Sequence, residues 1–111
     1  MAAPQPQLDY AANVEKYTST VDAAAVQGIV KYLGIALQNR DSSLVAASDP
    51  EELKRVRESF MKRKLGLTQT DSELDTALKD VMTTMSGERN KSRVTVYYLL
   101  AKQFGKLGLF A

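Results

Sequence analysis

The 111-residue chain contains no cysteine, no histidine and no tryptophan. Without cysteine it can form neither a disulfide framework nor a thiolate nucleophile. Without histidine it lacks the side chain that most often serves as a general base near neutral pH and most often binds metals. An enzyme would therefore need carboxylate or lysine machinery, and no motif indicates one. Enzymatic activity is the least supported class, and we predict no catalytic residues, no metal site and no cofactor.

Long apolar runs are missing as well. No segment approaches the roughly 18 apolar residues that a membrane span requires. The N-terminal sequence MAAPQPQLDY has no basic region followed by an apolar stretch, as a secretory signal would. We therefore expect a cytoplasmic protein with no membrane partner. With 44% apolar and 25% charged residues, the composition is that of an ordinary globular chain, long enough for one core.

The charge is small but unevenly distributed. The net charge of the whole chain is +2, yet residues 1–50 carry a net −2 and residues 51–111 a net +4. This asymmetry permits a basic face in the second half of the chain without establishing one.

Apolar residues recur with helical spacing through most of the chain, and no segment alternates apolar and polar residues as a strand would. The spacing predicts an all-α domain, a compact orthogonal array of about five helices with one further short turn near Ser42–Ala46. Residues 1–8, which contain two prolines, are expected to form a flexible tail, and residues 9–111 a single helical domain. The expected helices run from Asp9 to Tyr17, from Asp22 to Leu33 or Leu37, from Asp49 to Gly66, from Thr70 to Met85 and from Asn90 or Ser92 to Phe104. The apolar stripe of the second helix reaches Leu37, and Gly34 either ends this helix near Leu33 or lets a neighbouring element approach closely.

Two of these helices have strong start signals. In the third, Asp49 is the expected N-cap, and Pro50 fits the first helical position, where its missing N–H is harmless. Glu52 then lies where a capping box places its acid. The fourth helix has the same pattern with Thr70 and Glu73.

The C-terminal stretch, NKSRVTVYYLLAKQFGKLGLFA, is apolar on more sides than any other segment. A helix that is hydrophobic nearly all round is a buried one, so we predict that this helix is central and that the others pack onto it. Its only polar stripe is Ser92, Thr95, Lys102 and Lys106. The predicted core comprises Tyr17, Val26, Ile29, Val30, Leu33, Val56, Phe60, Leu74, Leu78, Val81, Tyr97, Leu100 and Phe104.

One short pattern occurs three times, as Tyr32-Leu33-Gly34-Ile35, Lys64-Leu65-Gly66-Leu67 and Lys106-Leu107-Gly108-Leu109. It is typical of a helix C-terminus, where glycine adopts the left-handed conformation and the apolar residue after it folds back onto the helix. A lysine before the glycine also favours the negative end of the helix dipole. The segments between the three copies differ in length, so recurrent capping explains them better than an internal duplication.

Three patterns resemble functional motifs and are better explained as structure. Ser59–Lys62 matches S-x-x-K, but the companion motifs of that enzyme class are absent. Asp41–Glu52 has the length of an EF-hand loop, but Val45 and Ala46 occupy positions that require an oxygen ligand and glycine. Ser86–Ser92 leads into a helix N-terminus, where anions bind, but it has one glycine where a phosphate-binding loop uses two.

Two surfaces are candidates for a function. The first is a basic or anion-binding surface on the third helix and on the turn at 86–93, which suits a weak nucleic-acid binder. Intervening glutamates and the low net charge make this the weaker alternative. Its residues are Lys54, Arg55, Arg57, Arg63, Arg89 and Lys91.

The second candidate is apolar. A domain of this size has limited capacity to cover the C-terminal helix on every side, and the leftover apolar area can contact a second copy of the chain or another protein. A protein-interaction or self-association module, such as a homodimer, is therefore the leading hypothesis, close to even with complete coverage by the N-terminal helices. Its residues are Leu99, Leu107, Leu109 and Phe110.

Two strings, RDSSLVAASDPEELKRVRESFMKRKLGL and NKSRVTVYYLLAKQFGKLGLF, resemble the small bacterial proteins grouped as domain of unknown function 2853. The similarity runs from about Tyr10 to Phe110. The resemblance implies a compact all-helical domain likened to EF-hand topology, and it supplies no functional residues. The departures at Val45 and Ala46 mean that the likeness does not imply calcium binding.

Overall fold

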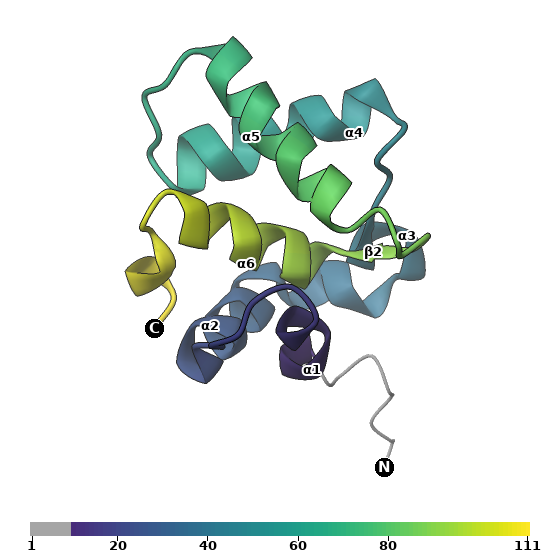
Figure 1. The fold of residues 1–111 in the computed structure, drawn as a ribbon, viewed down its shortest axis with the longest axis vertical. Helices are drawn as coiled ribbons and strands as arrows, with labels where there is room; N and C mark the ends of the chain where they lie inside the picture. The colour runs from purple at the N-terminus through teal and green to yellow at the C-terminus, as the bar shows by residue number, and fades with distance from the viewer. Residues whose placement is uncertain (1–9) are drawn as a thin grey trace.

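The C-terminal helix α6, Arg93–Gln103, lies at the centre of the molecule, as predicted (Figure 1). The structure is a computed structural model that describes residues 10–111. The expected tail at residues 1–8 and the expected helix start at Asp9 lie outside the described residues. Helices α4 and α5 lie on one side of α6 and helices α1 and α2 on the other, so the core forms around α6 (Figure 1). In chain order the elements are α1 Tyr10–Glu15, α2 Ala23–Leu33, the 3₁₀ segment η2 Gly34–Gln38, α3 Arg40–Ser43, β1 Leu44–Val45, α4 Pro50–Arg55, the π-helical segment η3 Val56–Lys64, α5 Asp71–Thr84, β2 Lys91–Ser92, α6 Arg93–Gln103 and the 3₁₀ segment η4 Leu107–Leu109.

The predicted all-α class is confirmed, and most of the expected helices are present. Within residues 10–111 no helix combines the length and the apolar character needed to cross a bilayer. The expected third helix is one run, α4 followed by η3, whose second half is wound as a π-helix. Such windings are rare, with hydrogen bonds reaching five residues back, as the bond from the Leu65 N–H to the Phe60 carbonyl does.

The helix starts were predicted well, with one error. Thr70 and Glu73 form the expected capping box. Asp49 caps α4, with Pro50 in the first turn, and its side chain accepts from the Glu51 N–H. The expected box with Glu52 is wrong, because the Asp49 N–H donates to a backbone carbonyl and the Glu52 side chain turns into the interior.

The recurrent glycine pattern predicted the helix ends only in part. Gly34 and Gly66 have positive φ, as expected, and Gly34 ends α2 at Leu33. At the third copy Gly105 takes the positive φ instead of Gly108. There the Lys106 N–H bonds back to the Ala101 carbonyl and closes α6.

The apolar residues after these glycines do not all fold back. Leu67 is buried as expected, but Ile35 is 81% exposed and Leu109 is 52% exposed. For these two residues the expectation is wrong.

Two short strands were not expected. Strand β1 pairs antiparallel with β2, with Leu44 opposite Ser92 and Val45 opposite Lys91. Each strand lies in a connector between helices, so the pairing joins two helix–loop–helix units at their loops. Pairing over 40 residues of separation leaves no local sequence signal. EF-hand topology for this arrangement stays a prediction.

The core agrees with the prediction at most positions. Four predicted members are only partly buried and pack against its edge: Tyr17, Val30, Leu33 and Phe104. Thr95 was expected on an exposed polar stripe, but it is fully buried, and its hydroxyl donates to the Asn13 side chain of α1. The buried predicted members are Val26, Ile29, Val56, Phe60, Leu74, Leu78, Val81, Tyr97 and Leu100.

Candidate functional site

A column of four aromatic rings leads from the interior to the surface. Phe60 and Tyr97 stack with their centroids 3.7 Å apart and their planes at 16°. Phe110 lies 6.1 Å from Phe60, and Tyr32 lies 5.9 Å from Phe110 and 6.2 Å from Phe60. Three of the rings are buried, and Tyr32 is 43% exposed at the outer end. The column therefore joins the end of α2, η3 and the C-terminal segment at one place on the surface.

The C-terminal segment packs closely against α2 at this place. A Cβ atom on Gly28 would lie 1.9 Å from the Phe110 carbonyl oxygen, which is closer than atoms can approach. Glycine is therefore required there for the close contact of two backbones. This contact fixes Phe110 in the core and leaves the preceding Leu109 outside it.

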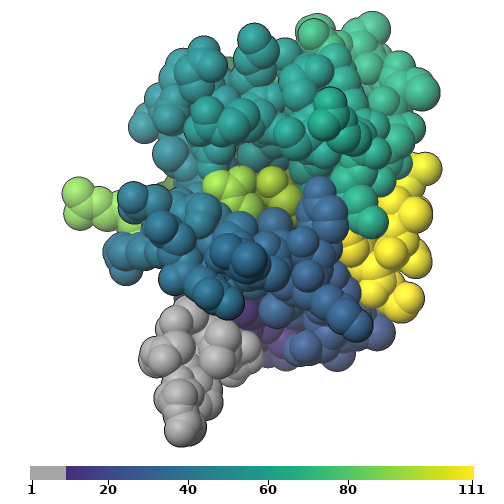
Figure 2. Space-filling model, turned by 180° about the vertical axis from the view of Figure 1, so that it is seen from behind, coloured from purple at the N-terminus to yellow at the C-terminus, as the bar shows by residue number. Residues whose placement is uncertain are grey.

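The surface at the outer end of the column presents Tyr32, Ile35 and Leu109, and we call it the Tyr32 patch. These are the large apolar side chains that are more than a third exposed within residues 10–111. Leu109 is next to Phe110, whose ring contacts that of Tyr32, and Ile35 follows Tyr32 by three residues. Figure 2 shows the yellow C-terminal residues beside the blue residues of α2 and η2, with the teal residues of η3 above them.

Lysine is held over the patch. The Lys64 ammonium lies 5.0 Å from the centre of the Tyr32 ring and 5.4 Å from that of Phe110. Both distances are within the range of cation–π attraction. Lys64 is four residues from the buried Phe60, so the two residues lie on the same side of η3.

A buried ion pair closes the inner end of the column. The Arg93 guanidinium pairs with the Glu52 carboxylate, and both side chains are about nine-tenths buried. The same guanidinium donates to the carbonyls of Ser42 (2.6 Å) and Leu44 (3.0 Å) and to the Tyr97 hydroxyl (3.2 Å). Burial opposes the Arg93 charge, but Tyr97 and Glu52 overcome that effect and raise the Arg93 pKa. All three guanidinium nitrogens therefore donate to partners within the fold, so the group is structural.

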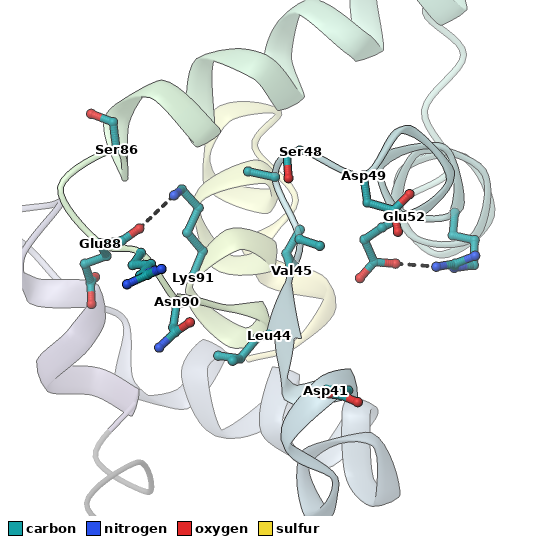
Figure 3. Close-up of a pocket in the computed structure, with 14 residues that line it drawn as sticks. Asp41, Leu44, Val45, Ser48, Asp49, Glu52, Ser86, Glu88, Asn90 and Lys91 are labelled. Carbon is teal, nitrogen blue, oxygen red and sulfur yellow. Dashed lines mark hydrogen bonds and ion pairs between the residues drawn. The ribbon is translucent and has the colours of Figure 1, made fainter.

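A hollow of about 740 Å³ lies between the two connectors (Figure 3). It is lined by Asp41, residues 44–49, Glu52, Arg55, Ser86 and residues 88–91. Its ionic groups are mostly engaged in holding the connectors. The buried Lys91 ammonium donates to the Glu88 carbonyl at 2.7 Å, Glu52 accepts from Arg55 at 3.3 Å, and Asp49 caps α4 (Figure 3). Within residues 10–111 no three acidic side chains are grouped to hold a metal ion.

Glu88 joins this turn to α1. Its carboxylate accepts from the Asn13 amide at 3.1 and 3.2 Å and from the Tyr17 hydroxyl, and it lies 3.5 Å from Lys16. Burial opposes the charged carboxylate, but these partners lower the Glu88 pKa overall. Burial and the hydrogen bond to Glu88 raise the pKa of Tyr17 to about 12. In the turn at residues 86–92, which we considered as an anion site, the Glu88 carboxylate therefore faces α1.

The structure does not bring the predicted basic residues onto one surface. Arg57 is only 15% exposed and pairs with Glu58, Asp71 and Asp75. Lys91 is buried, and Arg55 lies beside Glu52. Lys54 lines a groove between α4 and α5, whereas Arg89 lines the hollow between the connectors. Arg63 is exposed near the C-terminal end of η3. Binding of nucleic acid by this set stays a prediction.

The predicted apolar surface is also divided. Leu99 is partly buried between α5 and α6, and Leu107 is partly buried against the core. Phe110 is 8% exposed and belongs to the aromatic column, whereas Leu109 is open to solvent. The structure keeps Leu109 as a surface residue and adds Tyr32 and Ile35. Sequence reasoning missed Tyr32 and Ile35 because it explained the first copy of the recurrent glycine pattern as a helix cap. The signal that was available is that Ile35 and Leu109 occupy the same position in two copies of this pattern.

One protein family matches nearly the whole described chain. The family described as protein of unknown function (DUF2853) matches residues 9–108. No curated protein matches the chain.

Proposed function

The chain belongs to the DUF2853 family, whose description names no activity, and we propose that its domain is a protein-interaction module that binds through the Tyr32 patch. The observation that supports this is the exposure of Tyr32, Ile35 and Leu109, two of them in or next to the contact of the Tyr32 and Phe110 rings and the third three residues from Tyr32. Scattered single apolar residues are normal on protein surfaces, whereas grouped ones mark interaction sites.

The exposure of Ile35 is the strongest part of this observation. An isoleucine side chain gains about 1.5–3 kcal/mol from full burial, and at 81% exposure Ile35 gains little of it within the chain. A partner that covers Ile35 and Leu109 would recover that free energy. The exposed Tyr32 ring adds an aromatic anchor of the kind that dominates binding energy at interfaces.

The patch is also firmly held. Phe110 and Phe60 support Tyr32 from below, and the contact at Gly28 fixes the C-terminal segment beside α2. A surface held in its binding conformation does not lose ordering entropy on association. The remaining ionic clusters of the described residues serve the fold itself, so the patch is the feature best suited to a partner.

The proposal can be tested without knowing the natural partner. We would immobilise the full chain and select binders from a displayed library of random peptides. Peptides with apolar anchors should be enriched, and Ile35→Asp and Leu109→Asp should each weaken their binding at least about tenfold, which corresponds to the loss of about 1.4 kcal/mol. Gln38→Asp is the matched control, because Gln38 is exposed on the same segment.

Enriched peptides that lose affinity for both Asp variants and keep it for the control would support the interaction module. No enrichment, or peptides that bind all variants equally, would refute it. Circular dichroism of each variant checks that the helical content is unchanged.

A further inference from the structure

The charged residues that neighbour the Tyr32 patch along the chain are of one sign. The patch and its lysines come from three stretches, residues 23–40, 59–70 and 93–111, and none of these stretches contains aspartate or glutamate. The cations nearest to the patch in sequence are Lys31, Arg63, Lys64 and Lys106. Within residues 10–111 none of these four forms an ion pair, since the ion pairs there involve other cations.

The carboxylates on the neighbouring surface are already paired with other cations. Lys62 and Arg57, which precede the patch along η3, pair with Glu58 and Asp71. Those acids are therefore neutralised on the α5 side of the helix. Lys64 projects to the other side, over the rings of Tyr32 and Phe110. The Lys64 charge at the patch therefore has no carboxylate partner among the described residues, whereas Arg57 and Lys62 on the neighbouring surface are paired with acids.

The recurrent sequence pattern supplies much of this surface. Its first copy contributes Tyr32 and Ile35, its second contributes Lys64, and its third contributes Lys106 and Leu109. The pattern was first explained as capping, and at Gly34 and Gly66 it does cap. The fold brings the three helix ends together, so residues that share a local role also form one surface.

We propose that the Tyr32 patch binds an acidic amphipathic protein segment, one with an apolar anchor flanked by aspartate or glutamate. This rests on the proposed function and names its partner class. The apolar anchor covers Ile35 and Leu109, and the flanking carboxylates approach Lys31, Lys64 and Lys106. Complementary charge speeds encounter and excludes wrong partners more than it adds affinity.

Two other occupants fit the patch less well. In a two-fold dimer a patch meets itself, so the lysines of one copy would face the equally basic patch of the other, and like charges across an interface are unfavourable. Nucleic acid would satisfy the lysines, but the most exposed apolar residues, Ile35 and Leu109, are aliphatic, and stacking on bases requires aromatic rings. An acidic segment with an aliphatic or aromatic anchor matches both features.

The test compares two fluorescent peptides with the full chain by anisotropy. Both peptides carry the same leucine and phenylalanine anchors at helical spacing, and glutamate flanks them in one and lysine in the other. The glutamate peptide should bind at least about tenfold more tightly, and its affinity should fall when salt is raised from 50 to 300 mM, because exposed charges are screened.

Two double variants test where the peptide binds. Lys31→Glu with Lys64→Glu should weaken the glutamate peptide at least about tenfold. Lys54→Glu with Lys79→Glu changes the net charge equally at exposed positions on the groove between α4 and α5, and it should leave the affinity within about twofold. Equal losses in both pairs would show only a net-charge effect and would overturn the proposal.

The remaining outcomes separate this inference from the proposed function. If both peptides bind equally and Ile35→Asp abolishes both, the module stands and the acidic partner is wrong. If neither peptide binds, the acidic partner is also wrong, and the peptide selection decides on the module. Tighter binding of vesicles of phosphatidylserine and phosphatidylcholine, of single-stranded DNA, or of a second copy in sedimentation would replace the acidic segment as partner.

Discussion

Gly28→Ala is the substitution for which local propensity and packing predict opposite signs. Gly28 lies inside α2, where alanine in place of glycine stabilises an exposed helix by about 1 kcal/mol. In this fold the new Cβ atom would lie 1.9 Å from the Phe110 carbonyl oxygen and 2.7 Å from its carbonyl carbon. Both atoms are backbone, so no side-chain rotation relieves the overlap. Either α2 and the C-terminal segment separate, or the segment leaves its position.

The magnitude follows from either response. Overpacking of a well-packed contact costs about 1–3 kcal/mol, and release of Phe110 would lose most of the about 1.5–3 kcal/mol that burying a phenylalanine provides. After subtracting the propensity gain of about 1 kcal/mol, we expect the free energy of unfolding to fall by up to about 2 kcal/mol. Urea denaturation followed by circular dichroism measures it.

Gly108→Ala is the matched control, because a Cβ atom there meets nothing within 4 Å and the backbone φ is not positive. Its free energy of unfolding should change by less than about 0.5 kcal/mol. If Gly28→Ala instead stabilises the protein by about 1 kcal/mol, propensity alone governs the site. The close contact of α2 with the C-terminal segment would then be wrong, and with it the support of the Tyr32 patch.

Three further substitutions test other parts of the fold. Arg93→Met leaves Glu52 buried without its main partner and should lower the free energy of unfolding by about 3–5 kcal/mol; adding Glu52→Leu should recover part of it, and a double variant worse than the single would contradict the pairing. Tyr17 has a folded-state pKa of about 12, so the unfolded chain loses this proton first, near pH 10, and stability falls as the pH rises from 10 to 12; Tyr17→Phe should reduce that fall in denaturation measured at pH 8 and 11, and an unchanged slope would exclude its bond to Glu88. Thr70→Ala removes the cap of α5 and should cost about 1 kcal/mol, whereas Thr68→Ala, just outside the helix, should be near neutral.

The parts of the fold that sequence predicted are the ones with local causes. The capping box at Thr70 and Glu73 needs only four consecutive residues, and the burial of α6 follows from its apolar composition. Gly34 and Gly66 end helices because glycine tolerates a positive φ. Each of these features depends on residues within one segment, so the sequence of that segment is enough to predict it.

The errors have long-range causes. Glu52 has the sequence position of a capping acid, but Arg93, 41 residues away, competes for it and draws it into the interior. Thr95 was assigned to a polar stripe, but it is buried because its hydroxyl bonds to Asn13, 82 residues away. The pairing of β1 with β2 likewise depends on two connectors that only the tertiary fold brings together.

The candidate site shows the same division. Sequence identified Leu109 and the recurrent pattern that contains Ile35, but it assigned the apolar residues of that pattern to caps. Which of them reach solvent depends on how the helix ends meet: Leu67 is buried, whereas Ile35 and Leu109 are exposed. The basic residues, in contrast, were grouped because they share a helix, and the fold sends them to different faces.

An NMR titration shows whether the Tyr32 patch is a protein-binding surface. We would label the full chain with ¹⁵N and add a peptide enriched by the selection described above, following each backbone amide. The shifted signals should belong to residues 31–35, 63–65 and 106–110, with little change elsewhere. Shifts concentrated in the connectors, at residues 41–49 and 86–91, or an unchanged spectrum at saturating peptide, would contradict it.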